Sequence, residues 1–203
     1  LTMVNQLLDL SKLESNNLTV EWIQGDVITF LKYLTESFHS YALGKNLNLA
    51  FFSKEDHLEM DYDQEKLQQI LSNLISNAIK FTPDYGSVKV IVSQTILDNS
   101  KYLKIEIQDT GNGIPKENLS AIFNRFYQVD ESDTRTNEGS GIGLALTKEL
   151  TQLLDGEIEV ESTPNVGTSF RLLFPISRNA NKEQAIPIKK TTIPSHNLNG
   201  SLA

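Results

Sequence analysis

The chain has 203 residues, 39% of them hydrophobic and 22% charged, which is typical of a globular protein with one sizeable core. Its net charge is −8 at pH 7, so a nucleic-acid or anionic-membrane partner is not indicated, and no apolar run approaches the ~20 residues that span a membrane. There is no cysteine, which excludes disulfides and is consistent with the cytosol.

The N-terminal part of the chain predicts helices and short strands. Residues 1–16 carry Met3, Leu7 and Leu10 at the spacing of a coiled-coil helix, and an ordinary core-packing helix is the alternative. The elements expected next are a strand over 17–24, a helix capped by Asp26 that runs to about Lys45, and short strands over 47–52 and 58–62.

The most informative element is the helix that follows Asp63, a suitable N-cap. Its apolar residues recur at the spacing of a buried helical face. They are Leu67, Ile70, Leu71, Leu74, Ile75, Ala78 and Ile79. Away from that face, Asn73, Asn77 and Lys80 fall within roughly 60° of each other. Two carboxamide oxygens and an ammonium group suit Mg²⁺ carrying a polyphosphate. A solvated polar face is the alternative, although Asn is a poor helix former.

Two alternating patterns, over 88–92 and 103–107, predict strands. Asp109 continues the apolar side of the second strand, so a buried carboxylate there needs a hydrogen-bond donor. Gly111 and Gly113 follow and permit backbone to approach a ligand closely. We therefore expect Asp109 to accept from an exocyclic amine, such as that of adenine; a loop-capping Asp is the alternative.

A second glycine cluster, over 139–144, opens a helix whose apolar pattern continues to Leu154. Glycines before a helix N-terminus can form a phosphate site from backbone N–H groups, although a single glycine-rich turn is weak support. The connection 116–138 is long for a compact domain. It predicts a mobile lid over the nucleotide, hinged at the two glycine clusters and anchored by Phe123 and Phe126.

The C-terminal part predicts two strands, over 157–162 and 167–175. Thr168 lies on the apolar side of the second strand. Its hydroxyl is expected near Asp109 if the strands are neighbours, where it could bond that carboxylate or a bound water. Residues 177–203 are polar in composition and predict a flexible linker or tail.

Five of these segments, in this order and spacing, resemble the ATP-binding motifs of sensor histidine kinases. They are 73–82, 109–114, 122–127, 139–144 and 167–168, which look like the N box, G1 box, F box, G2 box and final Gly-Thr element. The resemblance implies the Bergerat fold of DNA gyrase B, MutL and the heat-shock chaperones. This is a two-layer α/β (α+β) sandwich with a mixed, mostly antiparallel sheet and about three helices on one face. An N-terminal helix from a dimerisation hairpin is expected in addition.

The resemblance further implies a site for ATP and Mg²⁺. Asn77 is expected to be the principal metal ligand, Asn73 to lie close to the metal and phosphates, and Lys80 to contact phosphate; these three are the candidate catalytic residues. Phe81 is expected to stack on adenine. The other candidate nucleotide-binding residues are Asp109, Gly111, Gly113, Ile114, Phe126, Gly139, Gly141, Gly143, Leu144 and Thr168.

One position favours phosphoryl transfer over hydrolysis. The ATP-hydrolysing relatives place a Glu one turn before the metal-binding Asn, where this sequence has Asn73. A carboxamide is not a competent general base at neutral pH. The residues His39, His57 and His196 are the three histidines, and none matches the phosphoacceptor motif of the family.

We therefore expect a fragment with three parts: residues 1–16 from a truncated second hairpin helix, a catalytic domain over 17–176, and a tail over 177–203. It is expected to position Mg-ATP for γ-phosphoryl transfer to a His on a hairpin absent from this sequence. A nucleotide-gated interaction module without transferase activity is the alternative. The implied partners are the phosphoacceptor hairpin of the same protein, in cis or in trans within a homodimer, and a response-regulator receiver domain. The implied location is the cytoplasm, as part of a membrane-anchored kinase.

Overall fold

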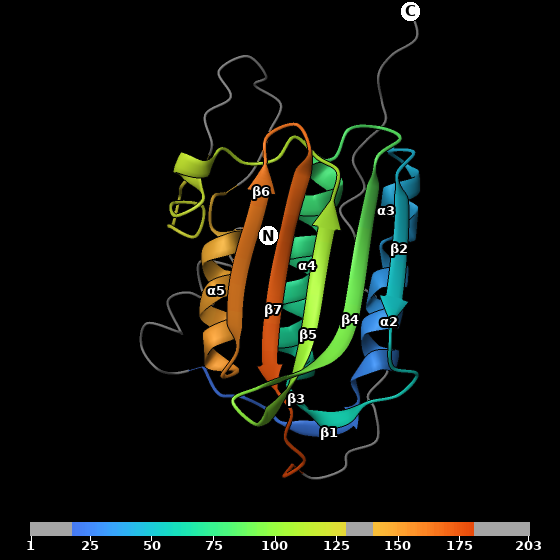
Figure 1. The fold of residues 1–203 in the computed structure, drawn as a ribbon, viewed down its shortest axis with the longest axis vertical. Helices are drawn as coiled ribbons and strands as arrows, with labels where there is room; N and C mark the ends of the chain where they lie inside the picture. Colours follow the sequence, from blue (N-terminus) through green and yellow to red (C-terminus); the bar gives the residue numbers. More distant parts are fainter. Residues whose placement is uncertain (1–17, 129–139, 181–203) are drawn as a thin grey trace, which may run out of the picture.

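A mixed five-stranded sheet forms one layer of the structure (Figure 1). The computed structural model describes residues 18–128 and 140–180. The strands are β2 (Asn48–Ser53), β4 (Ser87–Leu97), β5 (Ser100–Asp109), β6 (Glu157–Thr163) and β7 (Gly167–Pro175). They are arranged in the order β2-β4-β5-β7-β6, and all neighbours are antiparallel except β2 and β4.

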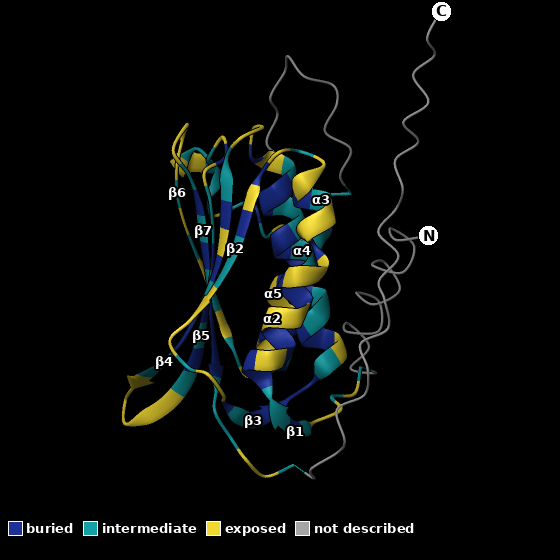
Figure 2. Cartoon of the chain, turned by 90° about the vertical axis from the view of Figure 1, so that its right-hand side faces the viewer, coloured by how far each residue is buried: buried dark blue, intermediate teal, exposed yellow. Residues whose placement is uncertain are grey.

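Helices form the second layer. The longer ones are α2 (Val27–Ser37), α4 (Gln64–Phe81) and α5 (Gly143–Leu153), and two short elements are α3 (His39–Leu43) and the 3₁₀ turn η1 (Lys116–Asn118). The view from the side shows α2, α3, α4 and α5 on the same face of the sheet (Figure 2). The expected two-layer sandwich is therefore confirmed. The helix expected over residues 1–16 lies outside the described residues.

The core lies between α4 and the two central strands. The inward side chains of β4 and β5 are fully buried, and the apolar stripe of α4 is at most 5% exposed. Burying one such aliphatic side chain stabilises the fold by about 1.5–3 kcal/mol. The predicted inward faces of these three elements are thus confirmed, and α4 cannot rotate about its axis without exposing its stripe.

A separate two-stranded sheet, β1 (Ile23–Asp26) with β3 (Glu59–Tyr62), closes the lower end of the domain (Figure 1). The strand expected over 17–24 is wrong in its bounds, because pairing begins only at Ile23. Just upstream, the backbone N–H of Glu21 donates to a carboxylate oxygen of Asp63 at 2.8 Å. A side chain, not a neighbouring strand, therefore holds the chain there.

The single helix expected from Asp26 to about Lys45 is divided at Phe38. Asp26 is its N-cap, as predicted. The hydroxyl of Ser37 donates to the backbone carbonyl of Leu34 at 2.6 Å. The backbone N–H of Phe38 donates to the backbone carbonyl of Thr35 at 3.1 Å. Hydrogen bonds to the carbonyl three residues earlier, as in a 3₁₀ turn, tighten the last turn of α2, and α3 starts directly afterwards.

Candidate nucleotide-binding site

Helix α4 is fixed at its start by a buried cap. Asp63 is the N-cap, as predicted: its Oδ1 accepts the backbone N–H of Lys66 at 3.0 Å, and its Oδ2 accepts the ammonium of Lys66 at 2.7 Å. The cap and the buried stripe together determine where the polar residues of the helix point. The candidate site residues among them are Asn73, Asn77 and Lys80, all half-buried.

Asn73 joins α4 to the first turns of α5. Its Nδ2 donates to the hydroxyl of Thr147 at 2.8 Å, and Thr147 is 1% exposed. Its Oδ1 lies against Gly143, where a Cβ atom would collide with it. The expected place of Asn73 near the phosphates thus comes with a packing role that the sequence did not indicate.

Asn77 lies one turn later on the same side of α4. Its carboxamide has no hydrogen-bond partner among residues 18–128 and 140–180. The side-chain oxygen is therefore not engaged by any described group and is chemically suited to a hard cation. Among the same residues, no three His, Cys, Asp or Glu side chains gather to hold a metal ion.

Lys80 and Phe81 end the helix and contact each other. The ammonium of Lys80 lies 5.0 Å from the centroid of the Phe81 ring, and that ring residue is 43% exposed. At the C-terminal end of α4, a cation and a partly exposed aromatic ring therefore lie together.

Asp109 ends β5, and one of its carboxylate oxygens is held by backbone. Oδ1 accepts the N–H groups of Gly111 at 2.8 Å and Thr168 at 3.2 Å. Oδ2 has no hydrogen-bond partner in the described part of the chain. Burial raises the pKa of Asp109 above its ordinary value although these two N–H groups act in the opposite direction.

Thr168 lies directly opposite Asp109 on β7, so the predicted neighbourhood of these residues is confirmed. The expected contact is different, because the backbone N–H of Thr168 bonds the carboxylate. Its hydroxyl pairs with the hydroxyl of Ser162 at 2.9 Å.

The loop after Asp109 packs against the end of α4. Gly111 is buried, and a Cβ there would lie 2.6 Å from the carbonyl oxygen of Phe81. The next N–H, of Asn112, donates to that same carbonyl at 3.3 Å. Only glycine permits this approach, so Gly111 joins the Asp109 carboxylate to the turn that carries Phe81.

Ser162 holds the other side of that loop. Its hydroxyl accepts the N–H of Ile114 at 2.7 Å and donates to the carbonyl of Gly167 at 2.9 Å. Gly113 has φ +70° and lies against the carbonyl of Thr163. The sequence interpretation missed Ser162, although it continues the inward alternation of β6.

The second glycine segment begins α5. The helix starts at Gly143 without a side-chain cap and has no acidic residue in its first turn. Its first N–H groups therefore favour an anion. Leu144 lies in this turn and is half-buried, Gly141 has φ +65°, and Gly139 lies outside the described residues.

The two expected anchors of the connecting segment differ. The ring of Phe123 packs edge-on against Phe170 at 6.4 Å between centroids. Phe126 is 63% exposed and is held through its backbone N–H, which donates to the carbonyl of Gly141 at 2.9 Å. The expectation that its side chain anchors the lid is thus wrong. Residues 129–139 of that connection are outside the described ranges.

These groups surround the second half of α4. Asn73 meets Gly143, and eight residues later Phe81 meets Gly111, about 12 Å further along the helix axis. The end of α4, the end of β5 and the start of β7 lie at the same end of the domain (Figure 1). The site is therefore elongated, with a carboxylate at one end and a helix N-terminus nearer the other.

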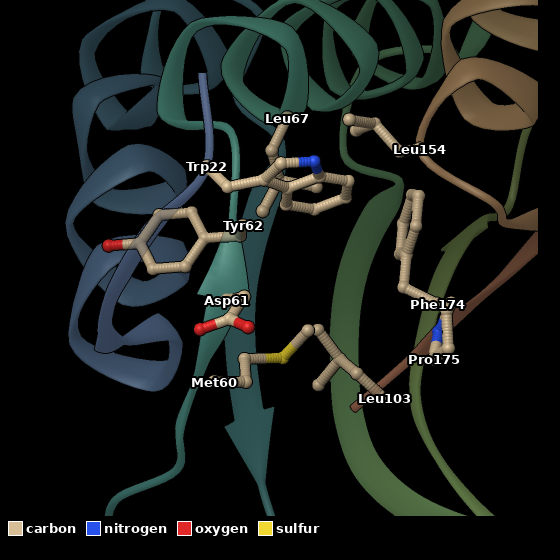
Figure 3. A pocket seen from close by; sticks show the side chains of 9 residues that line it. All are labelled: Trp22, Met60, Asp61, Tyr62, Leu67, Leu103, Leu154, Phe174 and Pro175. Atoms are coloured by element: carbon tan, nitrogen blue, oxygen red, sulfur yellow. The ribbon is translucent and has the colours of Figure 1, made fainter. Parts of the chain in front are cut away.

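An apolar hollow lies elsewhere. Trp22, Tyr62, Leu67 and Phe174 are among the residues that line it (Figure 3). Leu67 belongs to the first turn of α4, whereas Phe81 ends that helix. The hollow is thus at the far end of α4 from the candidate site.

The family model described as "Histidine kinase-, DNA gyrase B-, and HSP90-like ATPase" matches residues 62–178. The chain belongs to this family. The matched range includes α4, Asp109, both glycine segments and β7.

Relatives with known names are also histidine kinases. Histidine kinase P4 of Formosa agariphila is 36% identical over 88% of this chain and 13% of its own length. Hybrid signal transduction histidine kinase D of Dictyostelium discoideum is 33% identical over 98% of this chain and 13% of its own. Sensor histidine kinase WalK of Bacillus subtilis is 34% identical over 85% of this chain. The chain spans 28% of the length of WalK, so it matches only part of each relative.

Solved structures agree. Full-length ShkA in complex with AMPPNP has a TM-score of 0.75 and 25% identity, over 88% of this chain and 36% of that chain. The catalytic domain of histidine kinase ThkA has a TM-score of 0.66 and 22% identity, over 77% of this chain and 99% of that chain. This second match shows that the two proteins share a fold. The expected fold is confirmed, and the chain contains the ATP-binding catalytic domain of a sensor histidine kinase. None of the described helices is long and apolar enough to cross a membrane.

Proposed function

We propose that this domain positions Mg-ATP so that its γ-phosphoryl group is transferred to a histidine on a dimerisation hairpin. The carboxylate of Asp109 carries the proposal. Its Oδ1 is used by two backbone N–H groups, while its Oδ2 has no partner in the described residues. The amine of adenine can donate to Oδ2, whereas a guanine presents a carbonyl oxygen there and is repelled.

The other end of the site suits phosphates. The uncapped start of α5 offers backbone N–H groups from Gly143 and Leu144, and Lys80 adds a positive charge. Asn77 has a carboxamide oxygen without a partner in the described residues, which fits Mg²⁺, an ion that commonly takes one or two protein ligands and the substrate phosphates. When bound, Mg²⁺ neutralises charge on the phosphates.

Asn73 favours transfer over hydrolysis. Its Nδ2 is committed to Thr147, and its carboxamide cannot take a proton from water at neutral pH. In the proposed transfer a nitrogen of the acceptor histidine forms a bond to the γ-phosphorus. The bond from that phosphorus to the β–γ bridging oxygen breaks, and ADP leaves.

The acceptor is proposed to be a hairpin of the same protein, in cis or in trans within a homodimer, and a receiver domain is the proposed next acceptor. His39 is exposed at the start of α3, and His57 pairs with Asp26 at 3.1 Å. Neither contacts the groups of the candidate site. We further propose that the domain works in the cytoplasm as part of a membrane-anchored kinase.

Phosphotransfer in trans tests this function. The chain is mixed with labelled Mg-ATP and a separately produced hairpin from a histidine kinase that carries the acceptor His, and label on the hairpin is measured. Asp109→Asn is the inactive comparison. Asp56→Asn, which removes an exposed carboxylate between β2 and β3, is the matched control.

Calorimetric titration with AMPPNP and Mg²⁺ accompanies the assay. Binding together with label on the hairpin is the expected result. Binding without transfer, even when hairpin and chain are joined covalently, supports the nucleotide-gated interaction module instead. No binding by the folded chain overturns the ATP site altogether.

A further inference from the structure

Lys45 contacts the end of helix α4 from the loop between α3 and β2. Its ammonium group donates three hydrogen bonds of 2.9 Å each, to the backbone carbonyls of Ile79, Lys80 and Thr82. An ammonium has three donors, so all of them are used on this one turn.

The last carbonyls of a helix have no partner within it. At the end of α4, the carbonyl of Ala78 accepts from the N–H and the hydroxyl of Thr82, at 3.1 and 2.6 Å. The carbonyl of Phe81 accepts from Asn112 at 3.3 Å. The carbonyls of Ile79 and Lys80, between these two, accept hydrogen bonds from Lys45. Lys45 therefore caps this end of the helix.

The cap is also electrostatic. The C-terminal end of a helix carries a partial negative charge, which a cation placed on it offsets. The Lys45 ammonium is placed on that end. Burial lowers the pKa of Lys45, and the carboxylate of Asp84 partly offsets this shift. The three carbonyl acceptors favour the charged form.

We propose that Lys45 is a positioning residue for the nucleotide: by holding the last turn of α4, it sets the direction of the Lys80 and Phe81 side chains. The inference rests on the proposed function, in which Lys80 adds a positive charge for the phosphates, and on the expectation from the sequence that Phe81 stacks on adenine. Lys45 acts through the backbone of these residues, because its own donors are all used on carbonyls.

A double-substitution cycle tests this role. Lys45→Met, Lys80→Met and the double variant are compared with the unchanged chain for the dissociation constant of AMPPNP in Mg²⁺ buffer. Titrations are made well below each unfolding midpoint, so that every variant is folded. Lys89→Met removes the same charge from an exposed position on β4 and is the matched control.

Lys45→Met is expected to weaken AMPPNP binding about tenfold, and the loss is expected to be much smaller when Lys80 is already Met. The control is expected to bind as the unchanged chain does. Equal affinity for the folded Lys45→Met variant overturns the proposal, and so does a loss that adds fully to that of Lys80→Met and, in a second cycle, to that of Phe81→Ala.

A milder variant keeps the test valid if Lys45→Met does not fold. Lys45→Gln retains amide donors for some of the carbonyls and is expected to lose part of the affinity. Binding by Lys45→Gln that equals the unchanged chain overturns the proposal. Absence of AMPPNP binding by the unchanged chain would instead contradict the proposed function, so the two failures are distinguishable.

Discussion

The carboxylate of Asp61 accepts a hydrogen bond of 2.8 Å from the hydroxyl of Ser177, 116 residues later in the chain. The same carboxylate accepts the N–H of Asn179 at 2.5 Å and the side-chain amide of Gln24 at 3.3 Å. Asp61 thus ties the segment after β7 to the small sheet where the chain enters the domain. Figure 3 shows Asp61 together with Trp22 and with Phe174 and Pro175 at the end of β7. Residues 177–179, which the sequence assigned to a flexible tail, are hydrogen-bonded here.

Asp61→Asn is expected to lower stability at neutral pH and to flatten its acid dependence. Burial raises the pKa of Asp61, but hydrogen bonds from Asn179, Ser177 and Gln24 outweigh this, and the net pKa lies below its ordinary value of 3.8. A lowered pKa in the folded state contributes stability above the unfolded pKa, and this stability is lost as pH falls through the folded value. Hydrogen bonds to a charged group are worth about 1.5–3 kcal/mol.

Urea unfolding between neutral pH and pH 3 measures this effect. Asp56→Asn, at an exposed position, is the control and is expected to unfold as the unchanged chain does. An Asp61→Asn variant with the same stability at pH 7 as the unchanged chain would falsify the contribution of this carboxylate.

Asp109→Asn is expected to separate stability from binding. Burial raises the pKa of Asp109 in the folded state. Stability from such a group is fully present below the unfolded pKa and is lost as pH rises through the folded pKa, so the ionised form destabilises the nucleotide-free domain at pH 7. Asn can keep one oxygen for the N–H groups of Gly111 and Thr168, but its amide nitrogen would face the adenine amine.

The variant is therefore expected to unfold at an equal or higher temperature without nucleotide, and to bind AMPPNP about 100-fold more weakly. Thermal unfolding at pH 7 and calorimetric titration check the two parts. Normal AMPPNP affinity in the variant would remove Asp109 from the adenine site.

Thr147→Val is expected to weaken nucleotide binding through Asn73. The substitution keeps the shape of the side chain but leaves the Asn73 amide without its acceptor, which costs about 1–3 kcal/mol. The carboxamide beside Gly143 is then no longer held. Denaturant unfolding and AMPPNP titration give the two effects.

Thr151→Val is the matched control, because Thr151 is on the same helix and is 0% exposed. Its hydroxyl donates to the carbonyl of Thr147 within α5 and contacts no group of the site. If both variants bind AMPPNP equally well, the Asn73 contact does not support the site.

Ser162→Ala is expected to loosen the loop after Asp109. It removes the acceptor of the Ile114 N–H and the partner of the Thr168 hydroxyl, at a cost of about 1–3 kcal/mol. Hydrogen exchange of the Ile114 amide is expected to become faster. Ser169→Ala, on the neighbouring strand, is the control, and an unchanged exchange rate at Ile114 would contradict the assigned contact.

Local patterns in the sequence predicted much of the fold. The stripe and the polar face of α4 follow from a period of 3.6 residues, and the capping roles of Asp26 and Asp63 from side chains that reach their own helix. The same local reasoning failed at the first strand and at Phe38. The start of β1 depends on its partner strand β3, and the end of α2 depends on hydrogen bonds to the carbonyl three residues earlier in its last turn.

The sequence by itself determined the family, the order of the motifs and the residue types of the site, because each motif is a short segment whose spacing is visible along the chain. Only the tertiary structure decided that Lys45 caps α4 and that Asp61 holds Ser177. These contacts join residues 34 and 116 positions apart. Such pairs are brought together by strand register and helix packing, which no local pattern of polarity records.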